Sequence, residues 1–232
     1  MPDHPDLNRL RLEYADRERR LAGSERYSPF NQANLFAIQQ RQRETLVLLK
    51  KVGFSSFKTH RILEVGCGSG SVLTEYLGYG ADPACLHGID LLPHRVWEAQ
   101  ARLPHLPLAC ADGRFLPFPT ATFDLVLQYT AFSSILDEEV KKTMALDMLR
   151  VLRSEGVILW YDFWLNPTNP QTRGIRPGEI RQLFPGCQFH FRRVTLAPPI
   201  ARRLVPLSWL AATILEKLTI FNSHFLVVID PL

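Results

Sequence analysis

The feature that most constrains the fold is a glycine-rich segment directly after a short apolar run. Residues 61–70 read RILEVGCGSG, with Gly66, Gly68 and Gly70 spaced two apart. An apolar run that ends on glycines is typical of a buried parallel strand that meets a tight turn and a following helix. Glycines let the backbone approach a ligand, and the helix N-terminus offers free N–H groups. The segment therefore predicts a turn that binds a nucleotide-type cofactor.

The same rhythm of strand and helix recurs along the chain. The sequence predicts further strands at CLHGIDL, LPLACAD, FDLVLQY and GVILWYDF, with helices over 71–79, 93–102 and 137–153. Such alternation predicts a parallel sheet with right-handed crossovers. A connection rich in Pro, Asn and Gly follows, and then a short helix over 178–184, a strand over 187–196, an apolar helix and a last strand, HFLVVID. The pattern predicts an α/β, doubly wound, mostly parallel sheet of seven strands.

Two helices are expected before the sheet, from Leu7 to about Lys51, joined by the loop GSERYSPF. We expect one domain over 1–232, with an N-terminal helical cap or lid in 1–56, a cofactor-binding half in 57–165 and a substrate-side part in 166–232. Tyr27, in the loop between the helices, is a candidate to fold over the cofactor as part of a lid. An ordinary packing role for Tyr27 remains open.

An acidic residue separates this glycine turn from the dinucleotide-binding pattern. Glu64 stands two residues before Gly66, and Ser71 occupies the place of the third glycine in G-x-G-x-x-G. A carboxylate there would repel a pyrophosphate but suits a ligand with a sulfonium and an ammonium group. An NAD-linked oxidoreductase is therefore disfavoured. The stretch LEVGCGSG resembles the first motif of class I S-adenosylmethionine-dependent methyltransferases, which implies their Rossmann-like fold, S-adenosylmethionine as cofactor and S-adenosylhomocysteine as product.

Later motifs fall in register with this resemblance, which spans roughly 61–163. Asp90 ends the second predicted strand, where the family places an acid that accepts hydrogen bonds from both ribose hydroxyls. Asp112 lies where the family's acid meets the adenine amino group. Asp90 as a helix cap and Asp112 as a turn residue are the plain alternatives. The candidate cofactor-binding residues are Glu64, Gly66, Cys67, Gly68, Gly70, Asp90, Leu91, Asp112, Gly113, Gln128 and Tyr27.

Candidate catalytic residues stand at the ends of the fourth and fifth predicted strands. Methyl transfer requires an in-line approach, exclusion of water and, for a hydroxyl, removal of a proton. Tyr129, Tyr161 and Asp162 are the candidates. Asp162 is the hypothesised general base or substrate-orienting acid, because burial beside Tyr161 and Trp164 would shift its pKa. A cap on the following loop is the structural alternative for Asp162.

The acceptor is less constrained than the cofactor. QYTAFSSI follows the fourth strand in place of an N-P-P-Y-like run, which argues against amino-group methyltransferases of nucleic acids and of glutamine. We expect O-methylation of a small molecule or a sugar precursor, since LWYDFWLNPTNPQTRGI resembles methyltransferases of polysaccharide and secondary-metabolite biosynthesis. Tyr161, Asp162, Asn166 and Arg173 suit a polar sugar, whereas Phe132, Trp160, Phe163 and Trp164 suit an aromatic or terpenoid acceptor equally. A cofactor-binding regulatory or scaffold protein without catalysis remains the alternative.

The net charge and the spacing of the cysteines indicate which kinds of partner and metal site to expect. The formal net charge is +4 without a long basic tract, so no nucleic-acid partner is expected. Cys67, Cys85, Cys110 and Cys187 form no CxxC pair, so neither a metal site nor a disulfide framework is indicated. The N-terminus lacks the apolar core of a signal peptide, and a cytoplasmic location is expected.

The most apolar stretch is PLSWLAATILEKLTIF, residues 206–221. It is shorter than the ~20 residues that a membrane span needs, and it contains Glu216 and Lys217. We therefore expect no membrane span and favour a helix packed on the domain. An interfacial helix that meets lipid, or a partner subunit in a homodimer, stays open.

Overall fold

A seven-stranded sheet forms the centre of the molecule in a computed structural model, which describes residues 4–21, 23–165 and 169–231. The strand order is β3-β2-β1-β4-β5-β7-β6. Strands β1 to β5 are parallel, and β7 runs antiparallel to β5 and β6. The strands are β1 (Ile62–Val65), β2 (Leu86–Asp90), β3 (Leu108–Cys110), β4 (Phe123–Tyr129), β5 (Leu152–Phe163), β6 (Cys187–Leu196) and β7 (Asn222–Pro231).

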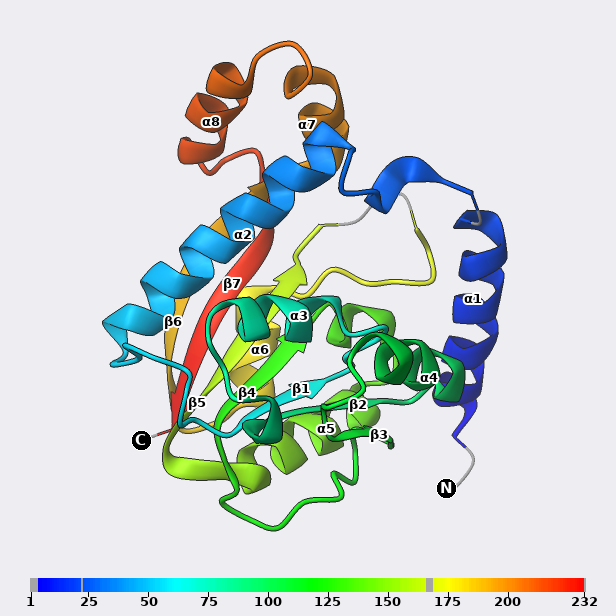
Figure 1. The fold of residues 1–232 in the computed structure, drawn as a ribbon, viewed down its shortest axis with the longest axis vertical. Helices are drawn as coiled ribbons and strands as arrows, with labels where there is room; N and C mark the ends of the chain where they lie inside the picture. Colours follow the sequence, from blue (N-terminus) through cyan, green and yellow to red (C-terminus); the bar gives the residue numbers. More distant parts are fainter. Residues whose placement is uncertain (1–3, 22, 166–168, 232) are drawn as a thin grey trace.

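Helices cover both faces of this sheet (Figure 1). They are α1 (Pro5–Leu21), α2 (Gln32–Lys51), α3 (Ser71–Gly78), α4 (Pro93–Arg102), α5 (Glu138–Val151), α6 (Pro177–Leu183), α7 (Pro198–Leu204) and α8 (Trp209–Lys217). Short 3₁₀ turns lie at Glu25–Tyr27, Pro83–Cys85 and Phe132–Ser134. The predicted α/β, doubly wound and mostly parallel architecture with N-terminal helices is confirmed.

Two apolar clusters bury the two faces of the sheet. Within β4, Leu125 and Leu127 join the cluster of α2 and α3, whereas Val126 joins the cluster of α1, α5 and α6. This alternation follows from the two-residue period of a strand. Strands β1 and β4 are almost wholly buried, as expected of parallel strands covered on both sides. The central strands are therefore a rigid support for the loops at their ends.

The C-terminal part brings a helical hairpin to the same edge of the sheet as the ends of the parallel strands. Phe163, at the end of β5, pairs with His224, and Leu196 pairs with Asn222. The connection 197–221 between β6 and β7, with α7 and α8, thus lies at the carboxyl edge of the parallel strands. Figure 1 shows α7 and α8 at the top, beyond the start of β7.

The apolar segment 206–221 differs from the expected single packed helix. Only Trp209–Lys217 is helical, because Ser208 caps the N-terminus through its Oγ, which accepts the Ala211 N–H at 3.1 Å. A separate helix, α7, precedes it with Pro198 and Pro199 in its first turn, where proline is tolerated. Most of the large apolar side chains in this segment are exposed. Packing against the rest of the chain therefore explains the apolar residues on one side of this helix, and those on the other side remain exposed.

Candidate functional site

A cavity of about 250 Å³ opens at the carboxyl edge of the sheet. Its walls come from the turn after β1, the end of β2, the loop after β3, the end of β4 and the inner face of α1. The described residues that line it include Leu7, Leu10, Tyr14, Arg41, Glu64, Gly66, Cys67, Gly68, Asp90, Leu91, Arg95, Asp112, Gly113, Arg114, Tyr129, Thr130, Ser134, Met144 and Tyr161. Such crevices at strand ends are where open α/β sheets bind ligands.

The glycine turn at one wall requires glycine at each of its three positions. Gly66, Gly68 and Gly70 have φ of 81°, 54° and 82°, in the left-handed region. A Cβ on Gly66 would lie 2.9 Å from the Ala131 Cβ, and one on Gly70 would lie 2.8 Å from a Leu103 methyl. The Ile89 carbonyl accepts the Gly66 and Cys67 N–H groups at 2.8 Å each, which ties the turn to β2.

Glu64 contributes a buried carboxyl group to this wall, and one of its oxygens lacks a hydrogen-bond partner among the described residues. The residue is 2% exposed, and its Oε2 has no hydrogen-bond partner in the described part of the chain. Burial raises the pKa of Glu64 well above its usual range, Glu75 and Asp90 act in the same direction, and Arg41 opposes them. An unpaired buried acceptor is unfavourable unless a ligand satisfies it. The site is thus short of a cation or a hydrogen-bond donor at Glu64.

Two guanidinium groups line the same cavity, each with a buried Nε–H that finds no acceptor among the described residues. Arg41 of α2 pairs with Glu75 and lies over the rings of Tyr129 and Tyr161, at 5.2 and 5.5 Å from their centroids. Arg95 of α4 lies over the glycine turn, where a Cβ on Gly68 would meet its guanidinium at 3.3 Å. The cavity therefore offers unsatisfied groups of both signs.

The acids at the ends of β2 and β3 are already held by local hydrogen bonds. Asp90 accepts the Gly68 N–H at 2.8 Å and the Leu92 N–H at 2.9 Å, one on each oxygen. Asp112 pairs with Arg114, whose Nη2 lies 2.7 Å from Oδ2 and whose Nε and backbone N–H also donate to the carboxylate. Each Asp90 oxygen retains a further lone pair, whereas each Asp112 oxygen already accepts two contacts from Arg114. Both acids line the cavity, and a ligand contact by either one stays a prediction.

Tyr129 and Tyr161 form the wall at the ends of β4 and β5. Their ring centroids lie 5.5 Å apart, and the Tyr161 hydroxyl is 2.8 Å from the Thr195 Oγ1. Burial raises the pKa of Tyr129 to about 12 and also raises that of Tyr161, so both hydroxyls stay protonated at neutral pH. Thr130 and Thr195, beside these tyrosines, have φ of 59° and 65°. Left-handed β-branched residues are strained, and such strain clusters at functional sites.

Asp162 and Gln128 lie behind this wall. Asp162 is 1% exposed and accepts the Ser133 N–H at 3.0 Å and the Phe163 N–H at 2.9 Å. Burial raises the pKa of Asp162 to about 6, and those hydrogen bonds oppose the shift. The Gln128 Oε1 accepts the Ala131 N–H at 2.9 Å. Both side chains support residues 130–134, and neither is among the described lining residues.

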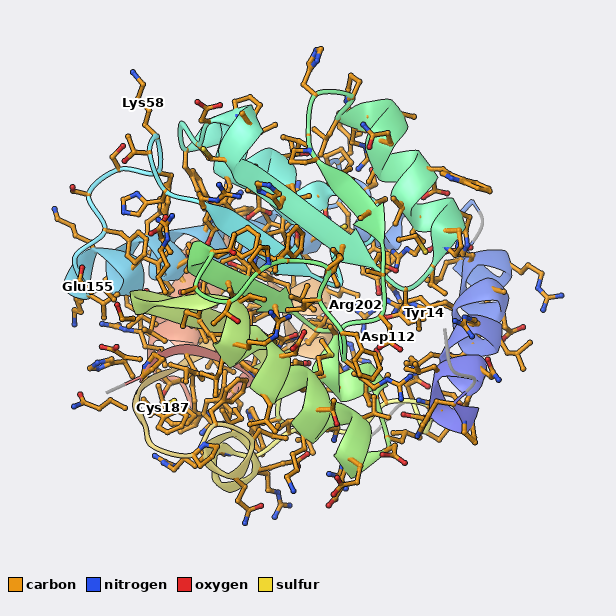
Figure 2. All side chains as sticks on the ribbon, turned by 90° about the horizontal axis from the view of Figure 1, so that it is seen from below. Tyr14, Lys58, Asp112, Glu155, Cys187 and Arg202 are labelled. Carbon is orange, nitrogen blue, oxygen red and sulfur yellow. The ribbon has the colours of Figure 1, made fainter. Side chains whose placement is uncertain are left out.

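Helix α1 closes the cavity from the N-terminal side. Leu7, Leu10 and Tyr14 face inward at helical spacing, and the Tyr14 hydroxyl lies 3.2 Å from the Ser134 Oγ. Figure 2 shows Tyr14 and Asp112 toward the same flank, with Lys58 and Glu155 at the far side. Tyr27 is 57% exposed, accepts a hydrogen bond from Arg17 and is not among the lining residues. A cofactor contact by Tyr27 stays a prediction.

Most of the site residues predicted from the sequence line the cavity, and several other lining residues were not predicted. Apart from Gly70, which begins α3 as its N-cap, and Gln128, Asp162 and Tyr27, every predicted site residue lines the cavity. The lining residues that were not predicted include Leu7, Leu10, Tyr14, Arg41, Arg95 and Arg114. The apolar spacing of Leu7, Leu10 and Tyr14 was a readable signal. Arg41 had none, because only the tertiary fold brings α2 to Tyr129 and Tyr161.

The residues considered for an acceptor are dispersed. Phe132 and Trp160 are fully buried in the core, with ring centroids 4.5 Å apart. Arg173 pairs with Glu138 and Glu179 away from the cavity. Asn166 lies outside the described residues. Within those residues, no cluster of three or more His, Cys, Asp or Glu could hold a metal ion, and all four cysteines are free.

Comparison with known proteins gives the relatives of this chain. Residues 62–156 match the methyltransferase domain family. The chain is 30% identical to an uncharacterised Haemophilus influenzae protein over 132 residues, which cover 54% of this chain and 50% of that protein. It is 37% identical over 117 residues to phthiotriol/phenolphthiotriol dimycocerosates methyltransferase 1 of Mycobacterium ulcerans, which cover 47% of this chain and 39% of that protein. The matches therefore span half or less of these relatives' length.

Solved structures share the fold over nearly the whole chain. A TehB-like S-adenosylmethionine-dependent methyltransferase from Corynebacterium glutamicum superimposes with a TM-score of 0.59. The superposition covers 95% of this chain and 97% of that one, at 17% identity. At that identity the likeness establishes the architecture of the sheet and its helices.

Proposed function

We propose that the chain is a class I S-adenosylmethionine-dependent methyltransferase with S-adenosylmethionine as its cofactor, and that it methylates a hydroxyl of a small, largely apolar molecule. The unpaired Glu64 oxygen at the cavity wall carries this proposal, with Asp90 and Asp112 along the same sheet edge. O-methylation of a sugar precursor is the variant of the proposal with a more polar acceptor. In both cases 57–165 would bind the cofactor and 166–232 would face the acceptor.

The cavity fits the charge pattern of this cofactor. S-Adenosylmethionine carries an ammonium, a carboxylate and a sulfonium. Glu64 offers an unsatisfied acceptor to the cationic groups, and the Nε–H groups of Arg41 and Arg95 are unsatisfied donors for a carboxylate. Glycine at positions 66 and 68 lets the backbone adopt the left-handed region and keeps the turn free of side chains of its own. Asp90 would hold the ribose hydroxyls and Asp112 the adenine amino group, with Leu91 and Gly113 beside them.

The chain's own residues would position the acceptor and exclude water. When bound, S-adenosylmethionine supplies a methyl group that the positive sulfur already activates. Tyr129 and Tyr161 keep their hydroxyl protons at neutral pH, so they would orient an acceptor hydroxyl by hydrogen bonds and would not act as bases. Leu7, Leu10 and Tyr14 close the site from the α1 side. Asp162 would hold residues 130–134 in place, and its role as general base remains the competing hypothesis.

The preference for an apolar acceptor rests on two observations. The name of the M. ulcerans relative gives dimycocerosates as the molecules on which that protein acts. The helical hairpin at the same edge of the sheet exposes large apolar side chains. Both fit an acceptor with substantial hydrocarbon surface better than a free sugar.

We propose a cytoplasmic location with this reaction, since the free cysteines suit a reducing compartment.

Titration calorimetry with S-adenosylhomocysteine and with NAD tests the cofactor site. We expect binding of S-adenosylhomocysteine alone, and binding of NAD alone would overturn the proposal. A methyl-labelled cofactor incubated with hydroxylated lipids and polyketide-like acceptors then tests the reaction. Labelled product that resists mild base would exclude a methyl ester and is the result expected of an ether. Cofactor binding without consumption across such acceptors would favour the regulatory or scaffold alternative.

A further inference from the structure

Residues 197–221 carry an exposed apolar face at the carboxyl edge of the sheet. Leu207 is 83% exposed and Leu210 is 71% exposed. Leu210, Ile214 and Leu218 follow one another at intervals of four residues in helical backbone, so they share one side of α8, and Leu207 lies in the turn before it. Ile220 and Phe221 extend this surface. Monomers rarely expose a contiguous apolar patch of this kind without a function.

The opposite side of the hairpin is firmly packed. Ala201, Val205 and Ala212 form a buried cluster with Phe36 and Leu196. The Trp209 ring meets the Phe36 ring edge-on, with centroids 5.1 Å apart. The hairpin is thus anchored to α2 and the end of β6. Its outward apolar face is a fixed feature of the surface.

The exposed charges of the hairpin itself have one sign. The exposed charged residues within 197–221, all of which are described, are Arg202, Arg203 and Lys217. The single acid of this segment, Glu216, is 6% exposed and turns inward to Arg43, at 3.3 Å. An apolar helix face bordered by cations has the composition of a segment that lies in a membrane interface.

We propose that the α7–α8 hairpin docks on the surface of a bilayer that contains anionic phospholipids. Leu207, Leu210, Ile214 and Leu218 would enter the boundary between headgroups and acyl chains, and Arg202, Arg203 and Lys217 would contact lipid phosphates. No described helix is long and apolar enough to cross a membrane, so the association is peripheral.

The docked orientation would bring the catalytic edge toward the membrane. Residues 197–221 and the cavity lie at the same edge, since β7 starts beside the end of β5. An apolar acceptor could then reach the site from the lipid phase. This last consequence rests on the proposed function, whereas the docking itself does not.

A second copy of the chain fits this face less well than a membrane does. A two-fold interface places the same patch on both subunits. It would bring Arg202, Arg203 and Lys217 of the two copies together, without an exposed acid in the hairpin to compensate. Like charges at an interface are unfavourable. An anionic surface supplies the opposite charge.

Vesicle flotation with the full chain, without cofactor or acceptor, tests the proposal. We expect binding to phosphatidylcholine vesicles that contain phosphatidylglycerol, and at least tenfold weaker binding to phosphatidylcholine alone. Arg202→Ala with Arg203→Ala should weaken vesicle binding about thirtyfold, because the variant loses two basic contacts with the anionic surface. Leu210→Ser with Ile214→Ser should weaken vesicle binding on the order of a hundredfold, because the variant no longer buries two apolar side chains in the bilayer.

Matched variants away from the hairpin separate docking from general charge and exposure. Leu12→Ser changes an exposed leucine of α1, and Lys50→Ala with Lys58→Ala removes two exposed charges near the start of β1. Both controls should bind vesicles as the wild type does. Failure of the wild type to bind anionic vesicles, or equal losses in the controls, would overturn the proposal. So would a dimer in solution that only the Leu210→Ser, Ile214→Ser variant dissociates. Because no methyl transfer is measured, an inactive enzyme leaves this result unaffected.

Discussion

Glu64 dominates the electrostatics of the site at the scale of single residues. Its carboxyl is buried between Glu75 and Asp90, with Arg41 as the nearby cation that already pairs with Glu75. In the free protein these surroundings favour the protonated form of Glu64. A cationic ligand would reverse that preference, because an opposite charge nearby stabilises a carboxylate. Cofactor binding and Glu64 ionisation are therefore linked.

We predict that cofactor binding releases a proton from Glu64. The free protein holds this proton below the raised pKa and the complex does not, so affinity should rise with pH by up to tenfold per pH unit and level off above that pKa. Glu64→Gln should lower the affinity for the cofactor by roughly ten- to a hundredfold, because the variant loses a charge-assisted contact. Calorimetry in two buffers of different ionisation heat counts the protons. Equal proton release in wild type and variant would contradict the prediction.

The same variant should change the stability of the free protein. Because the folded-state pKa of Glu64 is raised, the stability from its protonated form is lost as pH rises through that value. Glu64→Gln should match the wild type below the ordinary glutamate pKa of 4.5, and it should exceed the wild type increasingly as pH rises from there to the raised pKa. Each kcal/mol gained should raise Tm by roughly 2–4 °C. A constant difference between the two unfolding curves at all pH values would argue against this link.

Asp162 allows a test of support against catalysis. Its carboxylate accepts the backbone N–H groups of Ser133 and Phe163 behind the cavity wall. If Asp162 holds residues 130–134, Asp162→Asn should lower stability by about 1–3 kcal/mol, the usual cost of an unsatisfied buried donor. Turnover at saturating acceptor should then fall less than tenfold. A fall of about a hundredfold or more, the range of general acid–base catalysis, would instead support the general-base hypothesis.

At the scale of elements, α1 is fastened over the cavity by polar contacts at both ends. Asp6 accepts the Leu136 and Asp137 N–H groups at 2.9 and 3.1 Å, and Arg9 donates to the Ser134 carbonyl at 2.6 Å. Glu18 lies 2.9 Å from the His94 Nε2 of α4. The helix thus bridges the loop after β4 and the helix after β2. Its release would uncover the cavity without breaking a strand.

We predict that loosening α1 weakens cofactor binding more than it weakens the fold. Asp6→Ala with Arg9→Ala should lower cofactor affinity about tenfold or more, because the lid no longer excludes water from the site. Circular dichroism should still show one cooperative unfolding transition. Arg19→Ala, an exposed change on the same helix, is the control. Unchanged affinity in the double variant would remove the lid role of α1, and Tyr27→Ala tests the Tyr27 contact separately.

At the scale of the whole molecule, the cofactor site joins parts that are far apart in sequence. The cavity lining runs from α1 through the ends of β1, β2, β3 and β4 to Tyr161 of β5. A ligand bound there stabilises the folded state only, and thus the entire sheet with its lid. Thermal stability is therefore a direct measure of whether the site accepts a given ligand.

We predict that S-adenosylhomocysteine raises Tm and that NAD does not. At a ligand concentration of a hundred times Kd the stabilisation is about 2.7 kcal/mol, and Tm should rise by roughly 2–4 °C for each kcal/mol in a chain of this size. Thermal shift measurements across a concentration series give Kd as well. Glu64→Gln should need more ligand for the same shift. A larger rise with NAD would contradict the cofactor assignment.

Local sequence patterns were enough to predict the sheet, the glycine turn and the three acids at its edge. Strand periodicity, the G-x-G-x-G spacing and an acid at or near the end of each strand are properties of short segments. Parallel strands then bring their carboxyl ends to one edge, which is why Glu64, Asp90 and Asp112 meet in the cavity as predicted. The sequence did not reveal where α7 ends and α8 begins, because the apolar stretch 206–221 extends beyond the helix that forms within it.

Which side chains surround this turn and which face solvent depends on the tertiary structure. Arg41 reaches Tyr129 and Tyr161 from α2, which packs on the same face of the sheet, and Asp162 turns behind the wall to accept backbone N–H groups. The apolar pattern of 206–221 showed that a helix would form, but the outward turn of Leu210 depends on α2 and β6 covering the other side. Periodicity records which residues share a face, whereas burial depends on what the rest of the chain brings against that face.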